Sequence, residues 1–170
     1  VDVGLGECLH ALWLASRRLH VTSVDFSAVA RQRAAALSKQ RLGDDAGNLL
    51  TFEADLENWV PPARSYDLVL VVYLHLPAAQ RSAVMGAAAE AVAPGGTLLV
   101  VGHDLANLSS GHGGPQDPAV LYSPADIAAD IEPAHLTVAR AETAVRSLTD
   151  AQGQPVEALD ALVLAHRPVG

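Results

Sequence analysis

The chain opens with VDVGLGECLH (residues 1–10), in which two glycines follow a short apolar run that contains one acid. This order predicts a strand over residues 1–3, a tight turn, and a helix over residues 7–18. Glycine has no side chain, so a ligand can approach the backbone N–H groups of such a turn closely. We therefore expect a small-molecule site directly after the first strand.

Short β-rich runs alternate with longer alanine-rich runs along most of the chain. Strands are predicted at residues 19–26, 48–56, 66–76 and 97–105. Helices are predicted at residues 28–42, between Ser27 and Gly43, and from Pro77 to Pro94. The strands at 66–76 and 97–105 are apolar on both faces, which is typical of the centre of a parallel sheet. The alternation predicts an α/β protein with a doubly wound, mostly parallel sheet.

The remainder of the chain departs from this rhythm. Residues 102–122 have no sustained period, are rich in Gly, Ser, Pro and His, and follow a buried strand, so we expect a functional loop there. Ser123, Pro124 and Asp126 form a helix start of the capping-box type. Residues 136–148 and 156–167 are predicted to be two antiparallel strands joined by a turn.

Composition narrows the function classes. A chain of 170 residues with 50% hydrophobic content is expected to form one domain over residues 1–170. Its net charge of −8 disfavours nucleic acid as a partner. One cysteine excludes an internal disulfide, and we see no bilayer-crossing segment or signal peptide, so a cytoplasmic location without membrane association is expected. The sequence carries no signal for an oligomeric state.

Five motifs in order resemble those of class I S-adenosylmethionine-dependent methyltransferases: VDVGLGE, VTSVDFS, FEADLENW, YDLVLVVYLHLP and APGGTLLVVGHD. The closest likeness is to the small tellurite-resistance and thiopurine-methyltransferase type, and it covers essentially the whole chain. It implies a Rossmann-like, seven-stranded sheet of order 3-2-1-4-5-7-6, with helices on both faces and a C-terminal antiparallel hairpin. It also implies an enzyme that uses S-adenosyl-L-methionine to methylate a small-molecule acceptor.

The resemblance assigns cofactor-binding residues. Asp25 ends the second predicted strand, where a carboxylate can accept both ribose hydroxyls, although it can also serve as a helix N-terminal charge. Asp55 and the N–H of Leu56 would read the adenine edge, and Asp2 would orient the ammonium end of the cofactor. The full set implied is Asp2, Gly4, Gly6, Asp25, Phe26, Asp55, Leu56, Val72 and Tyr73.

The sequence also departs from the family pattern near the glycines. The family usually has a third glycine after the position of Glu7, followed by Arg and Asn, whereas Cys8, Leu9 and His10 stand here. A Cβ at Cys8 would narrow the cofactor space, and Arg18, where glycine is usual, would adopt a left-handed conformation. Because the first strand begins at once, we expect that an N-terminal leader helix is missing from this sequence.

Methyl transfer needs alignment of the acceptor and exclusion of water, and no protein nucleophile is obligatory. The segment VYLHLP lacks the pattern of methyltransferases that act on bases and amides. A hydroxyl or amine acceptor would need a base, for which His75 and His103 are the candidates, although either can simply line a pocket. The predicted acceptor pocket comprises His75, His103, Asp104, His112 and Tyr122.

Other functions remain open. No metal is expected, because the spacing of His103, Asp104 and His112 fits no defined zinc pattern. A nicotinamide-dependent oxidoreductase would also use the glycine turn and Asp25, but its fingerprint requires glycine at Leu9. A noncatalytic relative that binds the cofactor weakly is the second alternative.

Overall fold

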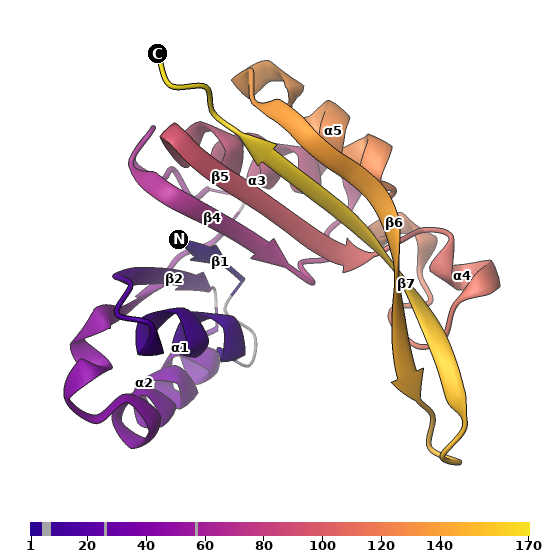
Figure 1. The fold of residues 1–170 in the computed structure, drawn as a ribbon, viewed down its shortest axis with the longest axis horizontal. Helices are drawn as coiled ribbons and strands as arrows, with labels where there is room; N and C mark the ends of the chain where they lie inside the picture. Colours follow the sequence, from indigo (N-terminus) through magenta and orange to yellow (C-terminus); the bar gives the residue numbers. More distant parts are fainter. Residues whose placement is uncertain (5–7, 26, 57) are drawn as a thin grey trace. The chain divides into compact units, whose positions relative to one another are not determined.

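The computed structural model describes residues 1–4, 8–25, 27–56 and 58–170. The chain divides into two compact units, Val1–Val60 and Pro61–Gly170, which we call the N-terminal and C-terminal units (Figure 1). The predicted organisation as one functional domain stays a prediction.

The N-terminal unit has a βαβαβ order: β1 (Asp2–Val3), α1 (Leu9–Ser16), β2 (Val21–Asp25), α2 (Ala28–Leu42) and β3 (Leu49–Glu53), with a 3-10 helix (Gly43–Asn48) before β3. Strand β2 pairs in parallel with both β1 and β3. As predicted, α2 begins after Ser27, whose hydroxyl accepts the N–H of Ala30 at 3.2 Å, and it ends at Gly43. The helices and strands bury an apolar cluster that includes Leu12, Val21 and Leu49.

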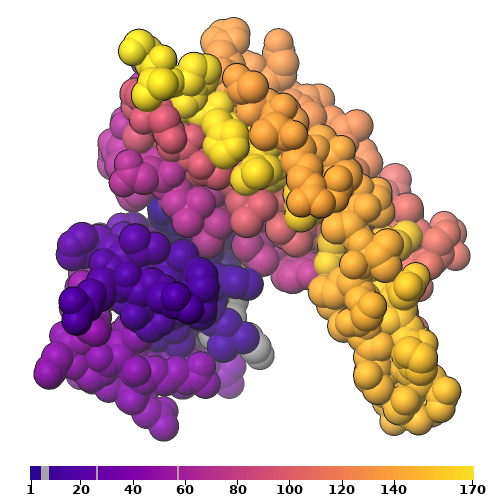
Figure 2. Space-filling view, viewed as in Figure 1, coloured from indigo at the N-terminus to yellow at the C-terminus, as the bar shows by residue number. Residues whose placement is uncertain are grey.

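The C-terminal unit contains β4 (Tyr66–Val72), α3 (Ala78–Ala91), β5 (Val92–His103), α4 (Asn107–Ser110), α5 (Pro124–Ile131), β6 (Thr137–Thr149) and β7 (Pro155–His166), with short 3-10 helices at Pro118–Val120 and Glu132–Ala134. Strands β4 and β5 are parallel, whereas β5–β7 and β7–β6 are antiparallel. The capping box predicted at Ser123 and Asp126 is present at the start of α5. The far end of the β6–β7 hairpin extends beyond the rest of this unit (Figure 2).

The strand order is β3-β2-β1-β4-β5-β7-β6, which confirms the predicted seven-stranded sheet and its terminal antiparallel hairpin. The start of β5 differs from the prediction, because the strand begins at Val92 and includes Pro94 and Gly96. Arg167, which follows β7, exchanges backbone hydrogen bonds with Gly95 and Gly96 at 2.9 and 3.0 Å, so strand pairing extends past the proline. Among the described residues, no helix is long and apolar enough to span a membrane.

Candidate functional site

Asp2 is a buried carboxylate in β1. It is 2% exposed, and the hydroxyl of Ser23 in β2 donates a long hydrogen bond of 3.4 Å to Oδ2. Burial raises the pKa of Asp2 to about 6, although the Ser23 hydrogen bond opposes the rise. A carboxylate that is costly to ionise gains most from a cationic partner, so Asp2 suits a positively charged ligand group.

Asp25 ends β2 and Asp55 follows β3. Oδ1 of Asp25 accepts the N–H of Ser27 at 2.7 Å, a local turn contact, and Oδ2 of Asp55 accepts the side-chain amide of Asn58 at 2.7 Å. Because β2 and β3 are parallel neighbours, both carboxylates lie at the same edge of the sheet. Leu56 beside Asp55 is buried. This edge therefore offers two carboxylates whose chemistry suits hydroxyl and amine donors.

Gly4, directly after β1, has the backbone conformation that glycine favours. Gly4 has φ of 84°, and its N–H donates to the carbonyl of Val24 at 2.9 Å. Cys8 and Arg18 also have positive φ, 64° and 63°, as expected for Arg18. Burial raises the pKa of the Cys8 thiol to about 11, so this residue is no nucleophile at neutral pH. The predicted cofactor residues Gly6 and Phe26 lie outside the described residues.

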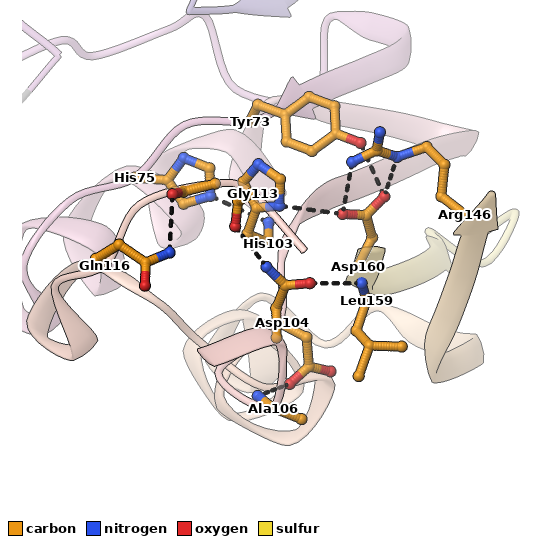
Figure 3. A network of polar contacts seen from close by, with 12 residues as sticks. Tyr73, His75, His103, Asp104, Ala106, Gly113, Gln116, Arg146, Leu159 and Asp160 are labelled. Atoms are coloured by element: carbon orange, nitrogen blue, oxygen red, sulfur yellow. Dashed lines mark hydrogen bonds and ion pairs between the residues drawn. The ribbon is translucent and has the colours of Figure 1, made fainter. Parts of the chain in front are cut away.

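In the C-terminal unit, Asp160 on β7 is the centre of a polar cluster (Figure 3). The hydroxyl of Tyr73 donates to its Oδ2 at 2.8 Å, and Nε of Arg146 donates to the same oxygen at 2.7 Å. Nδ1 of His103 lies 3.4 Å from Oδ1, an ion-pair distance without hydrogen-bond geometry. Asp160 is 4% exposed, so the Tyr73 hydroxyl and the Arg146 guanidinium compensate a carboxylate that water barely reaches.

His75 is held by backbone groups. Its Nε2 accepts the N–H of His103 at 3.1 Å, and a hydrogen bond with the backbone of Tyr73 also engages the ring. Burial lowers the pKa of His75, and the neighbouring His103 lowers it further. His75 is therefore neutral at pH 7, with both its face and its edge in contact with protein.

The ring of His103 is confined from several sides. It stacks on His75 with centroids 5.3 Å apart, and the ring of Tyr73 lies 5.0 Å away. Gly114 contacts the same ring so closely that a Cβ there would come within 2.9 Å. Burial lowers the pKa of His103, whereas Asp160 opposes this shift and Arg146 adds to it. The outcome is a fixed, neutral imidazole.

Tyr122 packs against His75. Its ring stacks on His75 at 5.8 Å, and the guanidinium of Arg81 lies 5.8 Å from its centroid. It is fully buried, and its hydroxyl has no hydrogen-bond partner among the described residues. That hydroxyl lies over Gly102, where a Cβ would collide with it. Burial raises the pKa of Tyr122, so its proton is not available at neutral pH.

Two predicted pocket residues are engaged elsewhere. Asp104 is buried and accepts the hydroxyl of Thr143 at 2.6 Å and the N–H of Ala106 at 2.9 Å, which are contacts that hold the loop after β5. The backbone N–H of His112 donates to Glu157 at 2.8 Å, and His112 lines an open hollow beside the β6–β7 hairpin. The structure thus brings together Tyr73, His75, His103 and Tyr122, and it places Asp104 and His112 outside this cluster.

Sequence reasoning missed Asp160 and Arg146. Both lie on the terminal hairpin, where alternation along the strands predicts which face a residue occupies but not which strand end it meets. The signal that was present is the acid inside the apolar run VEALDALVLAH, because a carboxylate buried in a strand requires partners. Among the described residues, no three His, Cys, Asp or Glu side chains are grouped to hold a metal ion.

Comparison with known families gives one match over the first part of the chain. A family model described as a methyltransferase domain matches residues 1–96. A comparison with curated protein sequences gives no match.

Solved structures share the fold over nearly the whole chain. A protein from Methanosarcina mazei described as an S-adenosylmethionine-dependent methyltransferase has a TM-score of 0.74 and 15% identity, with 99% of this chain and 92% of that chain covered. TehB from Haemophilus influenzae has a TM-score of 0.72 and 18% identity, with 98% and 57% covered. The [4+2]-cyclase SpnF has a TM-score of 0.74 and 14% identity, with 99% and 75% covered. At such identities the likeness shows the fold, which serves more than one reaction.

Proposed function

We propose, from the premise that the chain belongs to the methyltransferase domain family, that it is an enzyme that methylates a small-molecule acceptor. S-adenosylmethionine is the cofactor that this family and the structural neighbours imply. When bound, this cofactor would supply a sulfonium methyl group, whose carbon an acceptor would attack in line with the carbon–sulfur bond. The observation that carries the proposal is the buried Asp2 carboxylate beside the Gly4 turn, with Asp25 at the end of the neighbouring strand.

The N-terminal unit fits the cofactor by the chemistry of its side chains. Asp2, whose burial raises its pKa to about 6, suits the ammonium of the methionine part. The carboxylate of Asp25 suits a ribose diol, and Asp55 suits the exocyclic amine of adenine. Gly4 leaves the backbone accessible at the turn. The contributions of Gly6, Phe26, Leu56, Val72 and Tyr73 stay predictions.

The C-terminal unit supports a small, uncharged or weakly charged acceptor. Tyr73, His75 and His103 gather where β4 and β5 end, which is the edge at which open α/β sheets collect ligands. The net charge of −8 disfavours polyanionic acceptors such as nucleic acid. We accordingly assign the acceptor pocket to this edge.

The cytoplasmic location of the protein stays a prediction.

Two alternatives remain for the same fold. A noncatalytic relative is favoured by Cys8, whose side chain stands at positive φ where the family has glycine. A nicotinamide-dependent oxidoreductase would also use an acid at the end of β2, but the family match and the neighbours point to S-adenosylmethionine.

Methyl-labelled S-adenosylmethionine, incubated with the protein and a panel of small phenols, amines and thiols, tests the proposal. We expect label to pass to at least one class, and Asp25→Ala to reduce this transfer at subsaturating cofactor. Binding of the cofactor without transfer to any class would favour the noncatalytic alternative. Binding of NAD with no binding of S-adenosylmethionine would favour the oxidoreductase.

A further inference from the structure

We propose that His103 is the general base of this site, that Asp160 positions it with the ring proton on Nδ1, and that His75 is a structural residue. The inference rests on the proposed function and deepens it, because a base is needed only for an acceptor that carries a proton. It therefore assigns the acceptor to compounds with a hydroxyl or amine group.

The contacts of His75 remove it as a base. A neutral imidazole has one donor and one acceptor nitrogen, and the acceptor Nε2 is already used by the N–H of His103 at 3.1 Å. Protonation of Nε2 would set two N–H groups against each other at a part-buried position. The hydrogen bond with the Tyr73 backbone engages the ring as well. His75 thus ties the segment after β4 to the end of β5.

The contacts of His103 leave its ring available. Its backbone N–H, and not its ring, makes the hydrogen bond with His75. Nδ1 is buried and faces Oδ1 of Asp160 at 3.4 Å. A carboxylate accepts only, so it favours a proton on the nitrogen that faces it. Nε2 is then the nitrogen left to take a proton from an acceptor, and contacts of this kind tighten when a ligand binds.

The surrounding charges keep His103 neutral before the reaction. The groups that face it are Tyr73 and His75 from the segment after β4, Asp160 from β7 and Arg146 from β6. Arg146 binds Asp160 and offsets its negative charge, and Tyr73 donates to the same carboxylate. Burial and Arg146 lower the pKa of His103, which leaves Nε2 unprotonated and ready to accept.

The step balances within this arrangement. With the cofactor bound, the acceptor oxygen or nitrogen would gain the methyl group and lose a proton, and Nε2 of His103 would take that proton. The electron pair of the carbon–sulfur bond that breaks would stay on sulfur, which cancels the sulfonium charge. The resulting imidazolium is stabilised by Asp160 through Nδ1–H and returns its proton to water. Asp160 changes no bond of its own, so it is a positioning residue.

Nitrogen NMR of the histidine rings tests the positioning directly in the ligand-free protein. We expect the signals that disappear in His103→Gln to report a protonated Nδ1 and an unprotonated Nε2 at pH 7.5. Asp160→Asn should shift the ring toward the Nε2-protonated form that imidazole prefers in water. Glu142→Gln is the matched control, because it removes an exposed carboxylate that pairs with Arg140 on β6. A proton on Nε2 of His103 in the parent protein overturns the proposal, whether or not Asp160→Asn folds.

Transfer assays test the base role. With a phenol, His103→Gln should lose about 100-fold or more, whereas transfer to a thiol, which ionises without help, should change less than about 10-fold. Equal loss for both acceptors would overturn the base role and leave the proposed function standing. No transfer by the parent to either acceptor overturns the proposed function and the base role together, while the NMR result still reports the positioning.

Discussion

The imidazole of His75 accepts the backbone N–H of His103 at 3.1 Å, and the two rings stack with their centroids 5.3 Å apart. One histidine therefore fixes the backbone from which the other projects. The two neighbouring histidines therefore make different contacts. The ring of His75 binds the backbone, whereas the ring of His103 faces Asp160.

Gly114→Ala should displace His103. A Cβ at Gly114 would come within 2.9 Å of the imidazole, and φ of +76° adds backbone strain. Gly113→Ala is the matched control, because φ there is +74° and a Cβ meets nothing within 4 Å. Both variants should lose about 1 kcal/mol of unfolding free energy from the backbone. Only Gly114→Ala should also move the NMR signals of His103, and equal signals in the two variants would contradict the packing described.

Tyr122→Phe should stabilise the protein by about 1 kcal/mol, measured by urea unfolding. The hydroxyl is fully buried without a hydrogen-bond partner among the described residues, so its removal relieves a desolvation cost. Tyr73→Phe is the contrasting variant, because that hydroxyl donates to Asp160 at 2.8 Å, and its loss should destabilise. A loss of stability in Tyr122→Phe would show that the hydroxyl has a favourable partner.

Much of the fold could be predicted from local patterns. Alternation of apolar runs, the Ser27 cap and the capping box at Ser123 each involve residues close in sequence, and the structure has all three features. The extension of β5 through Pro94 could not be predicted this way. It depends on Arg167, which lies far along the chain and donates from its guanidinium to the carbonyls of Ala89, Val92 and Ala134.

For the candidate site, the proximity of His75 and His103 could be predicted, because both stand at the ends of apolar runs and the ends of neighbouring parallel strands meet at one edge of a sheet. Asp160 could not, because only the antiparallel register that pairs it with His103 brings it to this edge. Arg146 arrives through a second register, between β6 and β7. Side-chain contacts across such pairings are set by tertiary structure, so the acid inside VEALDALVLAH indicates that Asp160 needs partners but not which residues they are.

Asp2→Asn should change how stability depends on pH. Burial raises the pKa of folded Asp2 to about 6 from an ordinary value of 3.8. The folded state therefore holds the proton more tightly, and its stability falls as pH rises from about 4 through about 6, by roughly 3 kcal/mol in total. Asparagine cannot ionise and so removes this penalty. The free energy of unfolding of Asp2→Asn should therefore exceed that of the parent at pH 7.5 and be close to it at pH 4.

Urea unfolding at the two pH values measures the difference. Asp44→Asn is the control, since that carboxylate is exposed. A gain of the same size at both pH values would contradict the raised pKa of Asp2.

Asp25→Ala should weaken binding of S-adenosylhomocysteine by about 10- to 100-fold, because two ribose hydroxyls would lose an acceptor at a buried position, at a cost of about 1 to 3 kcal/mol. Calorimetric titration measures the affinity. Asp44→Ala, which removes an exposed acid of the same unit, should bind as the parent does. Equal affinity of Asp25→Ala and the parent would remove Asp25 from the cofactor site.

Calorimetric titration of the parent protein with S-adenosylmethionine, S-adenosylhomocysteine and NAD shows whether the chain binds the methyltransferase cofactor. We expect saturable binding of S-adenosylmethionine and its demethylated product, at one site per chain, and no binding of NAD. Saturable binding of NAD together with no heat from either sulfur compound would mean that the chain does not use S-adenosylmethionine.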